Sequence, residues 1–274
     1  MSSPAPQSPP FLTAALRVMD LSIGQMLWSR RTIFMALVVS GPVLIAAVTR
    51  LLTALGLPLE ARITGPGAFG LMIWVFYLRF TVPILGVFYG TSLIADEVDD
   101  KTITYLFTRP IARGAVLVGK YLAYLVCTAF VVLPSVVLVY LLIVPIRGDL
   151  GGSFIPAVKD LGLLAAGLAV YGALFAFIGA QFKRPLLIGL VFVFGWEQAA
   201  LAFPGYLKRF TLAYYLQALV PHAMPQDSTM SLIQSLFRES PDVTSSLFWL
   251  TGIWLAALVL ATRAVERREY VLEQ

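Results

Sequence analysis

The residues best suited to chemistry or to binding a partner lie between 94 and 122, in the sequence IADEVDDKTITYLFTRPIARGAVLVGKYL. Carboxylates begin this segment and arginines follow them, namely Asp96, Glu97, Asp99, Asp100, Arg109 and Arg113. Apolar residues recur at helical spacing over 103–111, which predicts a short amphipathic helix that Pro110 ends. A solvated loop rich in cations would explain Arg113 and Lys120, but it would not explain the carboxylates. The segment therefore favours a surface on which a cytoplasmic partner docks.

Other candidates for chemistry are weak. The sequence GAVLVGKY, from Gly114 to Tyr121, is close to a phosphate-binding loop. However, Tyr121 replaces the Ser or Thr that would hold Mg²⁺, and no strand precedes the motif. His222 is the single histidine and Cys127 the single cysteine, so no His cluster for a metal and no intrachain disulfide can form. We expect this chain to be non-catalytic and to hold no metal or cofactor.

The elements that position these residues follow from composition. Of the 274 residues, 59% are hydrophobic and 13% are charged, and the mean hydropathy is +0.84. Soluble domains carry about 25% charged residues, so the excess apolar surface must face lipid. Six segments are long enough to cross a bilayer as helices, near 33–52, 71–95, 115–144, 160–181, 186–204 and 246–262. The predicted fold class is an all-α integral membrane protein with six transmembrane helices.

The N-terminal region divides into two parts. Residues 1–10 are rich in Pro and Ser, which predicts a disordered tail, and residues 11–274 form a single transmembrane domain. Residues 11–31 predict an amphipathic helix with an apolar stripe of Leu12, Leu16, Met19, Ile23 and Leu27. This helix lies in the lipid interface or, alternatively, packs on a cytoplasmic protein.

Charge sets the orientation. More Lys and Arg residues flank the membrane on the side of the N-terminus than on the opposite side, so both termini are predicted to be cytoplasmic. The net charge of +5 then reflects membrane topology, and no nucleic-acid partner is expected.

Arg79 and Glu197 are the charges expected within the spans. Both should lie about 10–12 Å below the outer surface, so they could meet. A charge in hydrocarbon is costly, and a partner is therefore expected. Two readings remain open: a buried ion pair that fixes helix register, or a polar lining of a translocation path. Either side chain could also extend outward to the interface.

Two further patterns concern packing. Small residues step by four along the fourth span, which predicts close helix contacts within this chain or with a second copy. These residues are Ala165, Ala169, Ala173, Gly172, Ala176 and Ala180. The outer loop 205–245 contains apolar and aromatic residues around Tyr214 and Tyr215, which suggests a short helix lying on the outer surface.

The pattern Ile-Ala-x-Glu, Thr-Ile, Arg-Pro-Ile-x-Arg and Gly-Lys within 94–122 resembles the permease subunits of exporter-type (type 2) ABC transporters. The resemblance covers nearly the whole chain, and the WEQ and TLAYYLQAL sequences are similar to a six-span subgroup. It implies a coupling helix between spans two and three that docks onto a separate cytoplasmic ATPase. The residues that match are Glu97, Thr102, Arg109, Pro110 and Arg113. Asp100–Lys101 departs from the acidic residue and Gly of many members.

The resemblance also implies an activity and an assembly. The chain would be the permease of an ATP-driven exporter in the bacterial cytoplasmic (inner) membrane, moving substrate by alternating access. ATP and Mg²⁺ would be held by a dimer of ATPase subunits, and a second permease copy or a related permease would complete the complex in membrane lipid. A secondary transporter would need midplane ion sites and usually an inverted repeat. An intramembrane enzyme and a non-catalytic membrane scaffold also stay open as functions.

Overall fold

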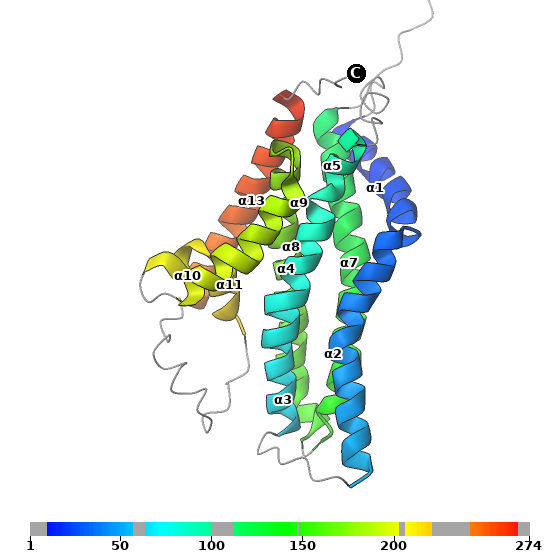
Figure 1. Ribbon diagram of the computed structural model, residues 1–274, viewed down its shortest axis with the longest axis vertical. Coiled ribbons are helices and arrows are strands. Elements are labelled where there is room, and N and C mark those ends of the chain that lie inside the picture. The colour runs from blue at the N-terminus through cyan, green and yellow to red at the C-terminus, as the bar shows by residue number, and fades with distance from the viewer. Residues whose placement is uncertain are drawn as a thin grey trace, which may run out of the picture.

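The computed structural model describes residues 10–56, 64–99, 112–146, 148–202, 206–220 and 242–267, and within these ranges the secondary structure is entirely helical. Figure 1 shows a tall bundle in which the longer helices run along the long axis. The elements are α1 (Phe11–Leu27), α2 (Arg30–Ala54), α3 (Gly65–Met72), η1 (Ile73–Thr81), α4 (Val82–Leu85), η2 (Gly86–Gly90), α5 (Ser92–Asp99), α7 (Arg113–Ile143), α8 (Leu150–Gln181), α9 (Pro185–Leu190), η3 (Val191–Glu197), α10 (Gln198–Ala202), η4 (Tyr206–Phe210), α11 (Leu212–Gln217) and α13 (Val243–Arg267).

Five helices in the described ranges are long and apolar enough to cross a membrane. They are Thr32–Ala54, Gly65–Ala95, Arg113–Ile143, Leu150–Gln181 and Val243–Arg267. The remaining predicted span, 186–204, coincides with a shorter apolar helix, Pro185–Ala200. A multi-pass helical membrane protein is therefore confirmed, whereas six crossings remain a prediction.

Three predicted boundaries differ from the observed helices, and one of them is the second span, whose helix begins at Gly65 rather than 71. The N-terminal helix ends at Leu27 rather than 31, because the chain turns at Ser29, whose hydroxyl donates to the Met26 carbonyl at 2.9 Å. The fourth span begins at Leu150 rather than 160. There the Asp149 side chain accepts a hydrogen bond from the Gly152 amide at 2.9 Å and caps the helix, ten residues before the apolar run that the sequence reveals.

Three stretches depart from α-helical winding. The second span contains two π-helical segments, η1 and η2, on either side of α4, and η3 is a third in the shorter helix. In a π-helix the hydrogen bonds run from i to i+5, and such segments recur at functional sites. η1 includes Arg79 and η3 ends at Glu197, so both charges that the sequence predicts within the membrane lie in π-helical backbone.

The small-residue stripe of α8 packs against α7 of the same chain. A Cβ atom at Gly172 would lie 2.1 Å from Tyr124 Cε1, so only glycine leaves room for this ring. The Tyr124 hydroxyl donates to the Leu168 carbonyl at 3.1 Å, and the Tyr121 hydroxyl donates to the Ala169 carbonyl at 2.8 Å. For this part of the stripe, the partner helix belongs to this chain and not to a second copy.

Helix α1 packs on α7 through its small residues rather than its leucines. Ala14 and Ala15 are buried, and a Cβ at Gly119 would lie 2.4 Å from the Ala15 carbonyl oxygen. Leu12, in contrast, is 70% exposed. The leucine stripe is thus free to meet lipid, and Gly119 of the phosphate-loop-like sequence serves close helix packing.

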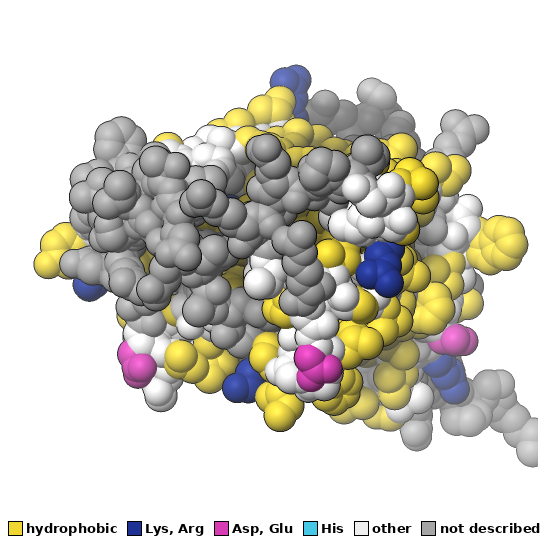
Figure 2. Space-filling view, turned by 90° about the horizontal axis from the view of Figure 1, so that it is seen from below, with side chains coloured by type: hydrophobic (Ala, Val, Ile, Leu, Met, Phe, Trp, Pro, Cys, Tyr) yellow, Lys and Arg dark blue, Asp and Glu magenta, His cyan; other side chains and the backbone are white. Residues whose placement is uncertain are grey.

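The surface reflects the lipid setting. Large apolar side chains are exposed along α2 and α13, and Figure 2 shows hydrophobic side chains over much of the described surface seen from below. Between α7 and α8 lies an open hollow of about 370 Å³, lined by residues such as Val136, Phe154 and Leu161. Its lining contains no charged residue, so the ionic chemistry of the described region lies elsewhere.

Candidate functional site

Two of the residues assigned to partner docking belong to described helices, Glu97 to α5 and Arg113 to α7, and α5 lies at the end of the bundle near α1 (Figure 1). The helix that contains Glu97, α5, contacts α7. Arg113 is the first residue of α7, and its side chain is exposed. Thr102, Arg109 and Pro110 lie outside the described residues, as does the helix predicted over 103–111. The segment thus connects two helices that are in contact, and its docking role stays a prediction.

Glu197 is the centre of a closed polar junction. Its side chain is only 2% exposed. The Tyr171 hydroxyl of α8 lies 2.8 Å from both carboxylate oxygens, and the backbone amides of Leu212 and Ala213 donate to Oε1 at 3.1 and 3.4 Å. Donors therefore surround the carboxylate, which is how a buried acid is tolerated in an apolar region.

Helix α11 supplies the two amides because it is inserted into the bundle. Residues Leu212 to Leu216 are buried. A Cβ atom added at Gly167, in the middle of α8, would lie 3.7 Å from the Leu216 side chain. The Tyr215 ring stacks on Trp249 of α13 with centroids 6.3 Å apart. The expectation of a helix lying on the outer surface is wrong. The first amides of a helix have no partner within the helix, so Glu197 satisfies donors that burial would otherwise leave unmatched.

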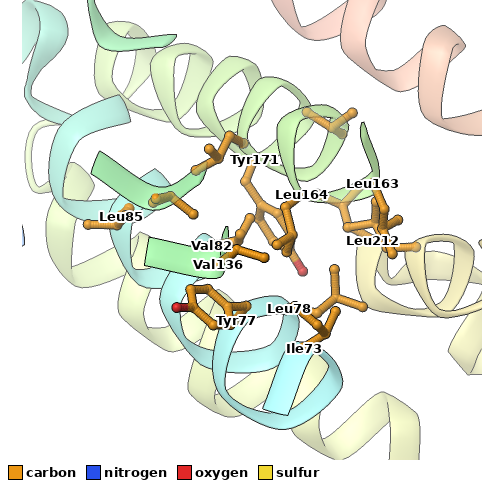
Figure 3. Close-up of a cluster of buried hydrophobic side chains, with 14 of the residues drawn as sticks. Ile73, Tyr77, Leu78, Val82, Leu85, Val136, Leu163, Leu164, Tyr171 and Leu212 are labelled. Carbon is orange, nitrogen blue, oxygen red and sulfur yellow. The ribbon is translucent and has the colours of Figure 1, made fainter. Parts of the chain in front are cut away.

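Figure 3 shows the buried cluster around Tyr171. Tyr171 extends from α8 into the cluster, Leu212 of α11 lies beside it, and Ile73 and Leu78 of η1 lie on another side. Residues of η1 and α11, which are distant from α8 in sequence, therefore enclose the Tyr171 side chain.

Arg79 has a different environment. It is partly exposed on η1, and its guanidinium carbon lies 4.9 Å from the centre of the Trp74 ring. In an α-helix, residues five apart point about 140° away from each other. The i to i+5 repeat of the π-helix instead brings Arg79 over Trp74.

Arg79 and Glu197 act on each other electrostatically without touching. The two opposite charges attract each other. Among the described residues, however, the carboxylate receives its hydrogen bonds from Tyr171, Leu212 and Ala213, and none from Arg79. The arrangement thus provides one enclosed anion with its donors in place and one partly exposed cation that has no hydrogen-bond acceptor among the described residues.

Sequence reasoning missed several of these features. Asp160 is completely buried within α8, ten residues after the start of that helix, whereas the sequence places it at the edge of the predicted fourth span. Lys208 of η4 is also buried and lies 6.0 Å from the Tyr214 ring. The role of Tyr171 has no signal in the sequence, since a tyrosine in an apolar run is common. The KD pair at 159–160 was the available signal for a charge within the span.

The comparisons with known proteins concern nearly the whole chain. Residues 12–270 match the family model described as ABC-2 family transporter protein. No curated protein matches the chain.

Proposed function

The chain belongs to the ABC-2 family of transporter proteins, and from this membership we propose that it is the permease subunit of an ATP-driven exporter in the bacterial cytoplasmic membrane. The match over residues 12–270 carries the proposal. A separate ATPase dimer binds ATP and Mg²⁺ on the cytoplasmic side. Two copies of the chain, or this chain and a related permease, form the membrane part of the complex.

The sequence supports an energy source in another chain. The only phosphate-loop-like sequence, from Gly114 to Tyr121, lacks the Mg²⁺-binding hydroxyl, and its Gly119 packs against the backbone of α1. A helix that packs this closely has no loop with which to cradle phosphates. ATP hydrolysis in a partner subunit is therefore the simplest arrangement.

Six crossings with both termini in the cytoplasm fit this role. The fifth crossing consists of α9, η3 and α10, from Pro185 to Ala202. At 1.5 Å per residue this helix is about 27 Å long, slightly less than a hydrocarbon core of about 30 Å. Local thinning of the bilayer accommodates such a short crossing at modest cost.

Coupling runs through the segment that contains Glu97, Thr102, Arg109, Pro110 and Arg113. In this proposal the ATPase binds the segment and, on closing around ATP, pushes it toward the second permease copy. The helix from Gly65 to Asp99 is continuous with the segment and contains Arg79, so the motion reaches the membrane interior. Substrate then leaves a cavity between the second and fifth crossings of two subunits, where the partly exposed Arg79 is the lining candidate, whereas Glu197 is enclosed within its own chain.

Purification of the full chain with its ATPase tests the docking surface. We expect Arg109→Glu combined with Glu97→Lys to abolish complex formation and the stimulation of ATPase activity, because one charge of each sign in the docking surface is reversed. The matched control is Lys159→Glu, an exposed charge reversal on α8 near the other end of the bundle. Unchanged complex formation and ATPase activity in the double variant would reject the coupling assignment.

A further inference from the structure

We propose that Trp74 and Arg79 form a binding site for the acidic headgroup of an amphiphilic substrate, such as a phosphate monoester or a carboxylate attached to an apolar body. This inference rests on the proposed function, since it assigns a substrate class to the candidate translocation path. It differs from a structural ion pair because the anion that completes the site comes from outside the chain.

The first support is the geometry of the cation. The guanidinium carbon lies 4.9 Å from the centre of the Trp74 ring, and this cation–π contact favours the charged side chain at this position. Guanidinium has five N–H donors in a fixed fork that matches the oxygens of carboxylate and phosphate. Among the described residues, none accepts a hydrogen bond from this fork.

The second support is that the nearest anion is already occupied. Glu197 is 2% exposed and is held by the Tyr171 hydroxyl and by the amides of Leu212 and Ala213. Moving this carboxylate to Arg79 would leave those buried donors without an acceptor, which is unfavourable. Glu197 therefore attracts Arg79 from a distance but does not neutralise it by contact.

The third support is position and surroundings. Arg79 is 14 residues from Gly65 and 16 from Ala95, so it lies near the middle of a membrane-spanning helix, where an unneutralised charge is costly. Val75 and Phe80 on the same π-helical segment are 36% and 47% exposed. Their spacing of five residues places them on one side of the π-helix, beside Arg79. A cation next to exposed apolar side chains suits a ligand that combines an anion with an apolar chain.

Binding to the full chain in phosphatidylcholine nanodiscs tests the site. The probes are dodecyl phosphate, dodecyltrimethylammonium, dodecyl maltoside and inorganic phosphate, and the signal is tryptophan fluorescence compared between wild type and Trp74→Phe. We expect dodecyl phosphate to bind most tightly and to change the fluorescence of Trp74. Arg79→Gln should weaken its binding at least about tenfold, because a charge-assisted hydrogen bond is lost. The affinity of Arg79→Lys for dodecyl phosphate should lie between those of wild type and Arg79→Gln, since lysine keeps the charge and loses the planar fork.

The control is Arg50→Gln, which removes an exposed arginine from α2 and should leave binding unchanged. Arg79→Lys also keeps the test valid if Arg79→Gln fails to fold. Equal binding of dodecyl phosphate and dodecyltrimethylammonium would overturn the site, and so would equal binding by wild type and Arg79→Gln. Inorganic phosphate that binds as tightly as dodecyl phosphate would overturn the amphiphilic substrate class.

ATPase stimulation by the same probes separates the two proposals. If the ATPase couples to the chain but shows no preference for dodecyl phosphate, and binding is equally unselective, the substrate class is wrong while the permease function stands. If no ATPase couples but Arg79-dependent binding of dodecyl phosphate persists, the binding site stands and the exporter role is wrong. Loss of self-association in Arg79→Gln, with dodecyl phosphate binding unchanged, would assign Arg79 to the contact between copies and overturn the proposal.

Discussion

Glu197 and Arg79 both lie in π-helical segments, yet the structure surrounds them in opposite ways. Glu197 has hydrogen-bond donors from two other helices and almost no exposed surface. Arg79 is partly exposed, lies against the Trp74 ring and has no hydrogen-bond acceptor among the described residues. In our proposal the carboxylate therefore has a structural role within the chain, whereas the guanidinium binds a ligand. Loss of each charge should therefore affect different properties.

Replacing Glu197 with Leu should give the largest loss of stability. The Tyr171 hydroxyl and the amides of Leu212 and Ala213 would lose their shared acceptor, at a cost of about 3 kcal/mol in the free energy of unfolding. Unfolding of the purified protein by SDS titration measures this loss. Glu266→Leu, at an exposed position of α13, is the control and should change stability little. Equal losses in the two variants would contradict the closed junction.

Tyr171→Phe should produce a smaller effect of the same kind. It removes one donor from Glu197 but keeps the ring and the two backbone amides, so we expect a loss of about 1.5 kcal/mol in the same titration. Tyr206→Phe removes a hydroxyl from a residue that is 75% exposed and serves as the control. If Tyr171→Phe were as stable as wild type, the hydroxyl would not be holding the carboxylate.

Arg79→Gln should change the free energy of unfolding by no more than about 1 kcal/mol, because this substitution removes only the cation–π contact with Trp74 and a weak through-space attraction to Glu197. The same variant is expected to lose ligand binding, so stability and binding respond separately at this position. SDS titration and the nanodisc binding measurement, applied to the same preparation, check both. A destabilisation as large as that of Glu197→Leu would remove the contrast between the two charges.

A double-mutant cycle with Arg79→Gln and Glu197→Gln should give the smallest value. Because the two side chains interact only through space, we expect a coupling energy of about 0.5 kcal/mol. A contact ion pair would instead couple the residues strongly, so that Glu197→Gln would partly rescue Arg79→Gln. Such a rescue would favour the buried ion pair over the open binding site.

Much of the fold was predictable because apolar length alone identifies a membrane-spanning helix. Spans at 33–52, 115–144 and 246–262 agree with α2, α7 and α13 to within a few residues. The start of α8 was missed because it is set by one hydrogen bond at Asp149, in a stretch where glycines and charges suggested a loop. Buried Asp160 was missed for the same reason.

The candidate site was predictable in its residues but not in its contacts. Arg79 and Glu197 stand out because charges are rare in apolar runs. An α-helical repeat, however, separates Trp74 from Arg79, and only π-helical winding brings them together. The burial of α11 was also unpredictable, since its aromatic residues suit a membrane surface as well as a protein interior. A prediction from sequence periodicity assumes α-helical winding, whereas Arg79 and Glu197 lie in π-helical segments.

In the proposed coupling, the wide turns of the second span also constrain the kind of motion that this span transmits. η2 lies between Arg79 and the acidic end of α5, and a π turn holds more residues than an α turn. Passing one residue from the wide turn into a standard turn would rotate the adjoining helix by about 100° and advance it by about 1.5 Å. A push at Asp99 would then reach Arg79 mainly as a rotation of the helix about its own axis, and not as a translation along that axis.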